Sequence, residues 1–175
     1  MKIKIKKIIG ERIYLKLLEE SNVTREYCDW LNDPAVNKYL TTKESTIDEL
    51  RQYIKKQVQD PNSFFVGIFE KTNDLHIGNI KLEPIDWKNK KAVFGILIGN
   101  KSYWNKGIGT EATKLICDYA FKKMGMEKVE LGVIASNIPA IKSYEKVGFK
   151  VDKIEKNVIR QGDKLFDKIE MSIKK

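Results

Sequence analysis

One stretch of the chain, Gly99 to Met124, constrains the possible folds more than any other. An apolar run, Ala92 to Ile98, precedes it and gives way to a short polar loop. The loop tightens into KGIGT, Lys106 to Thr110, and opens a segment whose apolar residues recur at helical spacing: Ala112, Leu115, Ile116 and Tyr119. A strand, a glycine turn and a helix in this order bring backbone N–H groups together with the positive end of a helix dipole. The stretch therefore predicts an anion-binding turn.

The rest of the chain alternates between strand and helix patterns and predicts one domain over residues 1–175, an α/β fold with a mixed sheet and helices on both faces. Strands are expected at Lys2–Ile9, Arg12–Leu17, Phe64–Glu70, Leu75–Leu82, Ala92–Ile98, Val129–Ala135, Val151–Arg160 and Lys164–Ile173. Helices are expected around Val23–Leu31, from Thr46 to Val58 with Ile47, Leu50, Ile54 and Val58 buried, after the glycine turn, and at Pro139–Val147.

Two of these strands carry a specific expectation about burial. Ala92–Ile98 and Val129–Ala135 are apolar on both faces, so we expect them in the middle of the sheet with helices covering both sides. Pro84 to Lys91 is expected to be a connection between two strands.

Composition excludes several classes of protein. The 175 residues carry a net charge of +9, but the lysines are spread along the chain among acids and arginine is scarce, so we expect no nucleic-acid surface. No apolar run approaches the roughly 20 residues that span a bilayer, and the basic start MKIKIKKII lacks the features of a signal peptide. Cys28 and Cys117 lack metal-ligand spacing, which favours two buried thiols in a reducing cytoplasm and no metal.

The glycine turn has an alternative interpretation. Gly107 to Ala112 matches G-x-G-x-x-A, the dinucleotide fingerprint. That fingerprint begins directly after the first strand of a βαβ unit, whereas here the residues from Gly99 to Lys106 intervene and the motif lies beyond mid-chain. No Gly-Lys-Ser/Thr follows either, so a Walker loop is absent. Glycines that merely permit a tight turn are a further alternative.

A second motif, NIPAIKSYEKVGF from Asn137 to Phe149, decides between these interpretations of the glycine turn. Together with WNKGIG, Trp104 to Gly109, it resembles the GNAT superfamily of N-acetyltransferases, although Trp104 stands where that superfamily usually has Gln or Arg. The stretches GERIYL and WLNDP, which begin at Gly10 and Trp30, are similar to the branch that holds ribosomal-protein N-terminal and amino-sugar N-acetyltransferases. The resemblance implies a mostly antiparallel sheet of about seven strands with a splayed centre.

The resemblance also implies acetyl-CoA as co-substrate and assigns residues to it. Amides of the turn would hold the pyrophosphate, glycines would let the backbone approach it, and lysines would add charge unless they are simply solvated. The strand before the turn would pair with the pantetheine arm, and a main-chain N–H near Leu97 or Ile98 would stabilise the oxyanion. The implied cofactor-binding set is Ile96, Leu97, Ile98, Trp104, Asn105, Lys106, Gly107, Ile108, Gly109, Thr110, Asn137, Ala140, Tyr144 and Lys146.

Proton transfer needs two further groups. Tyr144 is the candidate donor to the departing sulfur, with a core aromatic as its alternative role, and Asn137 is either a pantetheine contact or a helix cap. For the base, Glu83 and Asp86 qualify by position alone. His76 titrates near neutral pH and is a candidate base or substrate contact unless it is a turn histidine.

The acceptor stays open at this level. The implied reaction is direct attack by a primary amine in a ternary complex, on a monomer or homodimer. A small amine such as a nucleotide-linked amino sugar and a protein N-terminus are the two leading acceptors. An antibiotic, a polyamine, and a binding module that performs no chemistry are the remaining alternatives.

Overall fold

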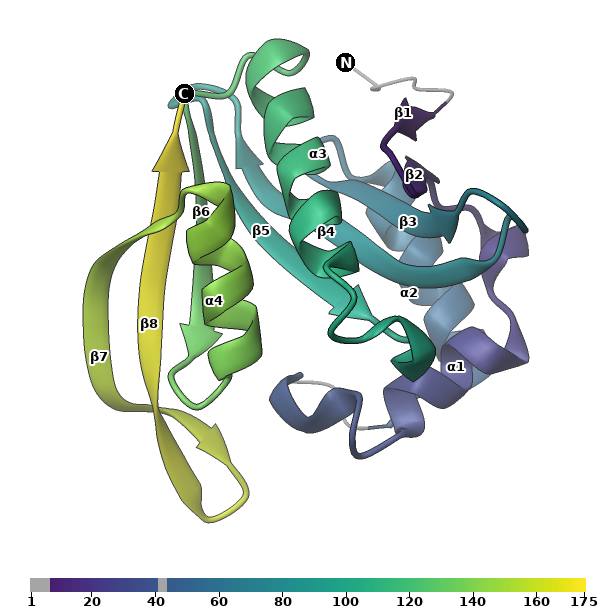
Figure 1. Cartoon of the computed structure of the whole chain (residues 1–175). Coiled ribbons are helices and arrows are strands. Elements are labelled where there is room, and N and C mark those ends of the chain that lie inside the picture. The colour runs from purple at the N-terminus through teal and green to yellow at the C-terminus, as the bar shows by residue number, and fades with distance from the viewer. Residues whose placement is uncertain (1–6, 41–43) are drawn as a thin grey trace.

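The computed structural model describes residues 7–40 and 44–175, which form one eight-stranded sheet with helices on both faces (Figure 1). The strand order is β1-β2-β3-β4-β5-β6-β8-β7, and only the β5–β6 pair is parallel. The strands are β1 (Ile8–Ile9), β2 (Ile13–Leu17), β3 (Phe64–Glu70), β4 (His76–Asp86), β5 (Lys91–Ile98), β6 (Lys128–Ile134), β7 (Lys150–Gln161) and β8 (Lys164–Lys174). The expected mixed, mostly antiparallel sheet is thus confirmed.

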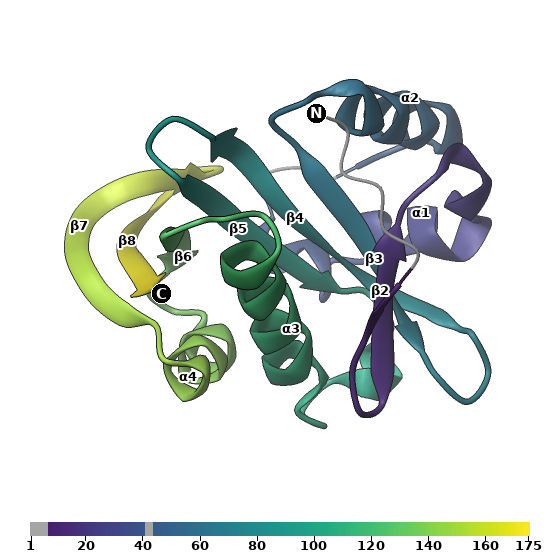
Figure 2. The same ribbon diagram turned by 90° about the horizontal axis from the view of Figure 1, so that it is seen from above.

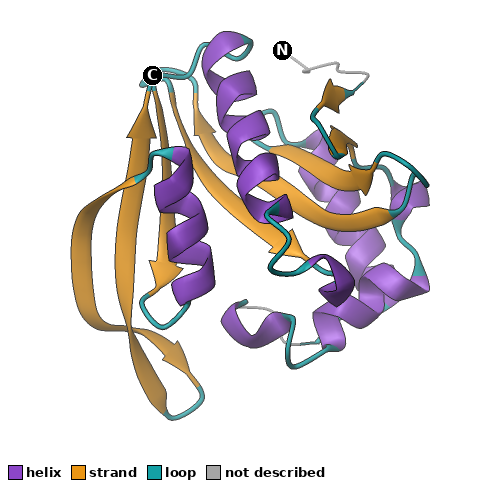
Figure 3. Ribbon diagram, in the orientation of Figure 1, coloured by secondary structure: helices purple, strands orange, loops and turns teal. Residues whose placement is uncertain are grey.

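Four α-helices cover the sheet in two pairs. They are α1 (Arg25–Asn32), α2 (Ile47–Gln59), α3 (Ile108–Lys122) and α4 (Ile138–Val147), with short 3-10 helices η1 (Glu20–Asn22), η2 (Asn37–Tyr39) and η3 (Lys101–Tyr103). Figure 2 shows α3 and α4 on one face and α2 on the other, and Figure 3 shows the same elements by type. The larger hydrophobic cluster joins the sheet to α3 and α4, and a smaller one joins it to α1 and α2.

Local sequence signals set where the helices begin and end. The Thr46 hydroxyl accepts a hydrogen bond from the Glu49 amide at the start of α2, and the Glu49 carboxylate accepts one from the Thr46 amide, which makes a capping box. At the end of α4, Gly148 adopts a left-handed conformation with φ of 109°, where glycine is favoured. The helix start expected at Thr46 and the helix end expected at Val147 agree with these two boundaries.

The centre of the sheet is split. β5 and β6 pair only through Lys91–Val93 and Lys128–Glu130, and the two strands diverge beyond that point. The second half of β5 therefore keeps its β4 neighbour but has no partner strand on its other edge, as the resemblance implied.

Several expectations about elements are wrong in detail. Val58 is 43% exposed and Gln57 is buried in its place, because Gln57 finds polar partners in Ser63 and Glu83. β4 continues through Pro84 to Asp86 with a register shift, so the expected connection there is partly strand. Of the strand expected at Lys2–Ile9, residues 2–6 lie outside the described residues.

The two central strands are less covered than their sequences suggested. Along β5 only Ala92 and Phe94 are buried, and in β6 Gly132 is exposed. Their apolar side chains serve a second purpose, because both strands line a cavity at the split.

Candidate active site

The glycine turn at the start of α3 offers unpaired backbone donors. Gly107 precedes the helix with φ of 76°, and Asn105 also adopts a left-handed conformation with φ of 58°. The Glu111 amide bonds to the Gly107 carbonyl, so the helical ladder begins there. Ile108, Gly109 and Thr110 precede this bond, and no side chain caps the helix. Their amides and the helix dipole together suit a phosphate group.

A charged pair that sequence reasoning missed holds this turn in place. The Arg12 guanidinium donates from Nη1 to the Lys106 carbonyl at 2.6 Å and from Nε to Glu111 Oε2 at 2.9 Å. The Arg12 backbone N–H donates to the other oxygen of Glu111 at 2.9 Å. Burial opposes ionisation of Glu111, but these bonds outweigh it and lower the pKa of the carboxyl. Arg12 thus ties the start of β2 to the glycine turn.

The remaining residues of the turn differ in their exposure. Thr110 and Ser143 share a hydrogen bond of 2.9 Å between their hydroxyls, which joins α3 to α4. A Cβ placed on Gly109 would meet only Ser143 Oγ at 3.8 Å and an Ile98 carbon at 4.0 Å, so the protein leaves room there. Lys106 and Lys146 are exposed, which leaves their side chains accessible to an anion.

The free edge of β5 exposes a defined set of backbone groups. The Gly99 amide bonds to the Ile77 carbonyl at 3.0 Å, which fixes the alternation of the β4–β5 ladder. By that alternation Leu97 directs its N–H toward β4, whereas Ile96 and Ile98 direct theirs toward the split. The expectation that Leu97 supplies the oxyanion donor is therefore wrong, and Ile98, the other residue named, has the required direction.

Trp104 has a structural task in this region. Its indole Nε1 donates to the Ile98 carbonyl at 2.8 Å. That carbonyl points away from β4 and would otherwise lack a strand partner. Trp104 therefore fixes the end of β5 beside the glycine turn, and this explains an aromatic residue where the family pattern has Gln or Arg.

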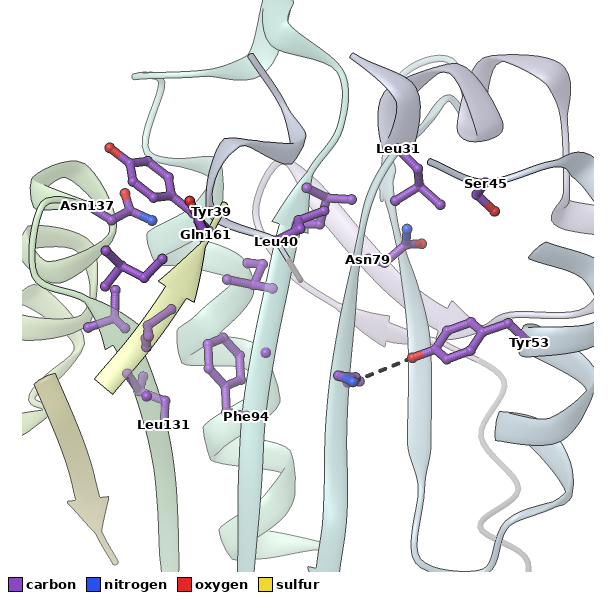
Figure 4. Close-up of a pocket in the computed structure, with 18 of the residues that line it drawn as sticks. Leu31, Tyr39, Leu40, Ser45, Tyr53, Asn79, Phe94, Leu131, Asn137 and Gln161 are labelled. Carbon is purple, nitrogen blue, oxygen red and sulfur yellow. Dashed lines mark hydrogen bonds between the residues drawn. The ribbon is translucent and has the colours of Figure 1, made fainter. Parts of the chain in front are cut away.

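A cavity of about 1090 Å³ passes through the split and continues over the face of the sheet toward α1 and α2 (Figure 4). On the split side it is lined by β5 from Phe94 to Leu97 and by β6 from Leu131 to Ile134. Across the sheet face it is lined by Leu31, Tyr39, Leu40, Tyr53, Asn79 and Lys81, and at its far side by the hairpin tip from Ile159 to Gly162. One continuous space thus reaches both edges of the split.

Tyr144 and Asn137 both line this cavity. Tyr144 lies edge-on to Phe94, with ring centres 5.8 Å apart, and burial raises the pKa of its phenol to about 12. Asn137 precedes α4 but makes no side-chain cap, so its amide is free to face the cavity. Ala140 does not line the cavity and packs against the core instead.

Two of the expected bases lie elsewhere. The Glu83 carboxylate accepts hydrogen bonds from Gln57 at 2.9 Å and Lys81 at 3.1 Å and does not line the cavity. Asp86 closes the β4–β5 turn through Asn89, whose bonds lower the pKa of the Asp86 carboxyl. The structure therefore does not bring either carboxylate into the lining of the cavity.

His76 is also outside the cavity, but it contacts a residue that lines it. Burial lowers the pKa of the imidazole, and Nε2 lies 3.0 Å from the Gly78 carbonyl and 2.8 Å from Asn79 Oδ1. Among the described residues, His76 Nδ1 and Asn79 Nδ2 are buried without hydrogen-bond partners. An unpaired buried donor costs about 1–3 kcal/mol, and Asn79 also lines the cavity, which makes it a candidate site residue that no sequence signal indicated.

The acceptor side of the cavity carries both signs of charge. Glu44, Glu49, Lys81 and Arg160 contribute to its lining. Burial opposes the charge on Lys81, but Tyr53 and Glu83 outweigh it and raise the pKa of the ammonium. The Tyr39 hydroxyl donates to the Ser136 carbonyl at 3.2 Å and so links η2 to the loop before α4 across one end of the cavity.

The part of the chain that the structure describes contains neither a cluster of metal ligands nor a membrane-spanning helix. Within 7–40 and 44–175, no group of three or more His, Cys, Asp or Glu side chains could hold a metal ion. No helix in the same part of the chain is long and apolar enough to cross a membrane.

The split sheet, the uncapped glycine turn and the cavity through the split together define an acyltransferase that uses an acyl-CoA. Residues 12–150 match the family model described as acetyltransferase (GNAT) domain. The chain therefore belongs to the GNAT family and is an acetyl-CoA-dependent N-acetyltransferase.

Individual relatives agree with this assignment. The chain is 30% identical over 159 residues to the protein named Probable N-acetyltransferase YjcK of Bacillus subtilis. The matched region covers 85% of this chain and 87% of the relative. Its fold is similar to a GNAT-family acetyltransferase of Bacillus anthracis, with a TM-score of 0.85, 21% identity and coverage of 97% and 98%. It is also similar to spermidine N-acetyltransferase of Vibrio cholerae, solved with CoA and spermine, with a TM-score of 0.86, 22% identity and coverage of 93% and 95%.

Proposed function

We propose that this enzyme acetylates the primary amine of a small molecule, such as a nucleotide-linked amino sugar, by direct attack within a ternary complex. The observation that carries the proposal is the single cavity of about 1090 Å³ that joins the split to the acceptor face. Acetyl-CoA supplies the thioester whose acetyl group is transferred. Because the cavity is continuous, the two substrates can meet without a covalent intermediate on the protein.

The residues fit acetyl-CoA along its length. The amides at the start of α3 suit the pyrophosphate, and the free backbone edge at Ile96 and Ile98 suits the pantetheine amides. Asn137 and Ile96 both line the cavity. Next to the thioester carbonyl, the Ile98 N–H would stabilise negative charge on oxygen.

Acetyl transfer requires two proton movements, and Tyr144 is suited to one of them. When the amine nitrogen bonds to the acetyl carbon and the carbon–sulfur bond breaks, the sulfur needs a proton, and the nitrogen must lose one. A phenol whose pKa is raised to about 12 stays protonated at neutral pH and can donate to the sulfur. Glu44 and Glu49 contribute carboxylates to the lining of the cavity and are the candidates to accept the proton of the amine.

The bounds of the cavity favour a small acceptor over a protein N-terminus. The Tyr39–Ser136 contact spans one end, and the hairpin tip from Arg160 to Gly162 lies along another side. Lys81 and Arg160 would also suit an anionic acceptor such as a nucleotide sugar.

The test is acetyl-CoA-dependent thiol release with four acceptor classes: nucleotide-linked amino sugars, N-terminal peptides, polyamines and aminoglycosides. We expect release with the amino sugars and an acetylated product by mass spectrometry. Turnover confined to peptides would replace the small acceptor with a protein N-terminus. Bound acetyl-CoA without release for any class would refute acetyl transfer to these amines.

A further inference from the structure

The amide nitrogen of Asn79 is a buried hydrogen-bond donor with no partner in the described chain. Asn79 lies on β4, is 4% exposed and contributes to the wall of the cavity. Figure 4 shows its side chain in the part of the cavity that also contains Leu31 and Leu40. Native proteins satisfy nearly all buried polar groups, so a donor left open beside a cavity points to a ligand.

His76 fixes which atom of the amide is left open. Its Nε2 lies within hydrogen-bond distance of both the Gly78 carbonyl and Asn79. Since a carbonyl can only accept, Nε2 must carry the proton, and the Asn79 atom that faces it must be the oxygen. The Nδ2 group therefore points away from His76. Tyr27, Trp30 and Phe69 pack around the imidazole, with ring centres 4.9–5.2 Å away, and hold it in this orientation.

The position of Asn79 places this donor on the acceptor side. Asn79 pairs with Leu97 in the β4–β5 register, next to the stretch of β5 that lines the split. Its neighbours in the cavity include Tyr53 and Lys81, which lie on the face toward α1 and α2. On that face the Asn79 amide forms part of the wall that an acceptor would contact.

We propose that Asn79 donates a hydrogen bond from Nδ2 to an oxygen of the acceptor, a carbonyl or hydroxyl near its amine, and that His76 is the positioning residue for this donor. The proposal rests on the proposed acetyl transfer and names the chemical class of the acceptor. An amine that carries only donors, such as a charged polyamine, cannot satisfy Asn79. Amino sugars and amino-acid amides can.

The experiment compares two acceptors of the same size and branching, glycinamide and isobutylamine, of which only glycinamide carries an oxygen. The kcat/KM for glycinamide is divided by the kcat/KM for isobutylamine, and this ratio is measured for the wild type, Asn79→Asp, His76→Phe and Asn73→Asp. Asn79→Asp keeps the shape and the acceptor for His76 but removes the open donor. His76→Phe keeps an aromatic ring but releases the amide. Asn73→Asp makes the same charge change in the β3–β4 turn, where Asn73 Oδ1 accepts from the Leu75 amide.

We expect the ratio to fall on the order of tenfold in Asn79→Asp, to fall less in His76→Phe, and to stay at the wild-type value in Asn73→Asp. The two amines differ in basicity, but this difference is the same for every variant and cancels. Acetyl-CoA affinity, measured by calorimetry, should be unchanged in all variants and reports whether each is folded.

Each other result overturns a different claim. Wild-type ratios in both Asn79→Asp and His76→Phe, with acetyl transfer intact, would refute the role of Asn79 and leave the proposed function standing. If the wild type binds acetyl-CoA but acetylates neither these amines nor the four acceptor classes, the proposed function fails and the inference fails with it.

Discussion

Tyr144 is the residue whose contacts fit the chemistry of the leaving group most directly. Its ring is held between Phe94 and Phe149, and burial keeps the phenol protonated. Replacing it by phenylalanine preserves these ring contacts and removes only the hydroxyl. We expect Tyr144→Phe to lower kcat by about 10²-fold, with the Kd for acetyl-CoA within about twofold of the wild type.

The matched control for Tyr144 is Tyr119→Phe. Tyr119 stacks on Phe64 in the core at 5.5 Å between ring centres, and burial also raises the pKa of its phenol. Because Tyr119 does not line the cavity, its loss of a hydroxyl should leave kcat unchanged. An equal fall in kcat for both variants would remove Tyr144 from the mechanism.

At the scale of the element, the start of α3 makes a steric prediction. A Cβ on Gly109 has room in the protein, so valine there should fold normally. The added methyl groups would occupy the approach to the helix N-terminus, and we expect Gly109→Val to raise the Kd for acetyl-CoA at least 10-fold, equivalent to about 1.4 kcal/mol. Calorimetric titration with acetyl-CoA measures this. Normal affinity would mean that the phosphates bind elsewhere.

The anchoring of the same turn makes a second prediction. Arg12→Lys keeps the positive charge but removes the fork that bonds at once to the Lys106 carbonyl and the Glu111 carboxylate. We expect the Kd for acetyl-CoA to rise about 3- to 10-fold, because a looser turn presents its amides less well.

Arg51→Lys is the control for Arg12→Lys. Arg51 forms a surface ion pair with Asp48 on α2, away from the turn, and its replacement should change neither affinity nor stability. If Arg12→Lys and Arg51→Lys had the same Kd for acetyl-CoA, the role of Arg12 in positioning the glycine turn would be contradicted.

At the scale of the whole molecule, a buried thiol and a buried phenol predict how the free energy of unfolding depends on pH. Burial raises the pKa of the Cys117 thiol from 9.0 and that of the Tyr144 phenol from 10.0, each to about 12. Above pH 9 the unfolded chain loses protons that the folded chain keeps, so this stability is present below pH 9 and is lost as the pH rises toward 12. We expect these two groups alone to lower the free energy of unfolding by roughly 2–4 kcal/mol between pH 8 and pH 11.

Urea unfolding at pH 8, 9.5 and 11 measures this loss. Cys117→Ala should remove the share that begins near pH 9 and leave the share that begins near pH 10. A free energy of unfolding that stays constant to pH 11 would contradict the burial of both groups.

The sequence predicted those features that depend on local chemistry. The glycine turn, the helix start at Thr46 and the helix end at Val147 follow from the conformations that the residue types at these positions favour. The split between β5 and β6 was expected from the family resemblance and is confirmed. Tyr144 and Asn137 were placed in the cavity for the same reason.

What the sequence missed depends on contacts between distant segments. Glu83 was expected after the strand but lies on β4, where Gln57 and Lys81 bind its carboxylate, and no local pattern reports such a partnership. The Arg12–Glu111 pair joins residues 99 positions apart. Leu97 and Ile98 differ only in the direction of their backbone groups, which the register with β4 determines.

The central claim is that both substrates meet in one cavity and that acetyl passes directly between them. Cys28 donates to the Ser45 carbonyl and Cys117 is buried with a raised pKa, so neither thiol is poised to carry an acetyl group. Initial rates measured while both acetyl-CoA and the acceptor are varied test this claim. Double-reciprocal lines that intersect are the predicted result. Parallel lines, together with an acetylated protein in the mass spectrum before acceptor is added, would contradict it.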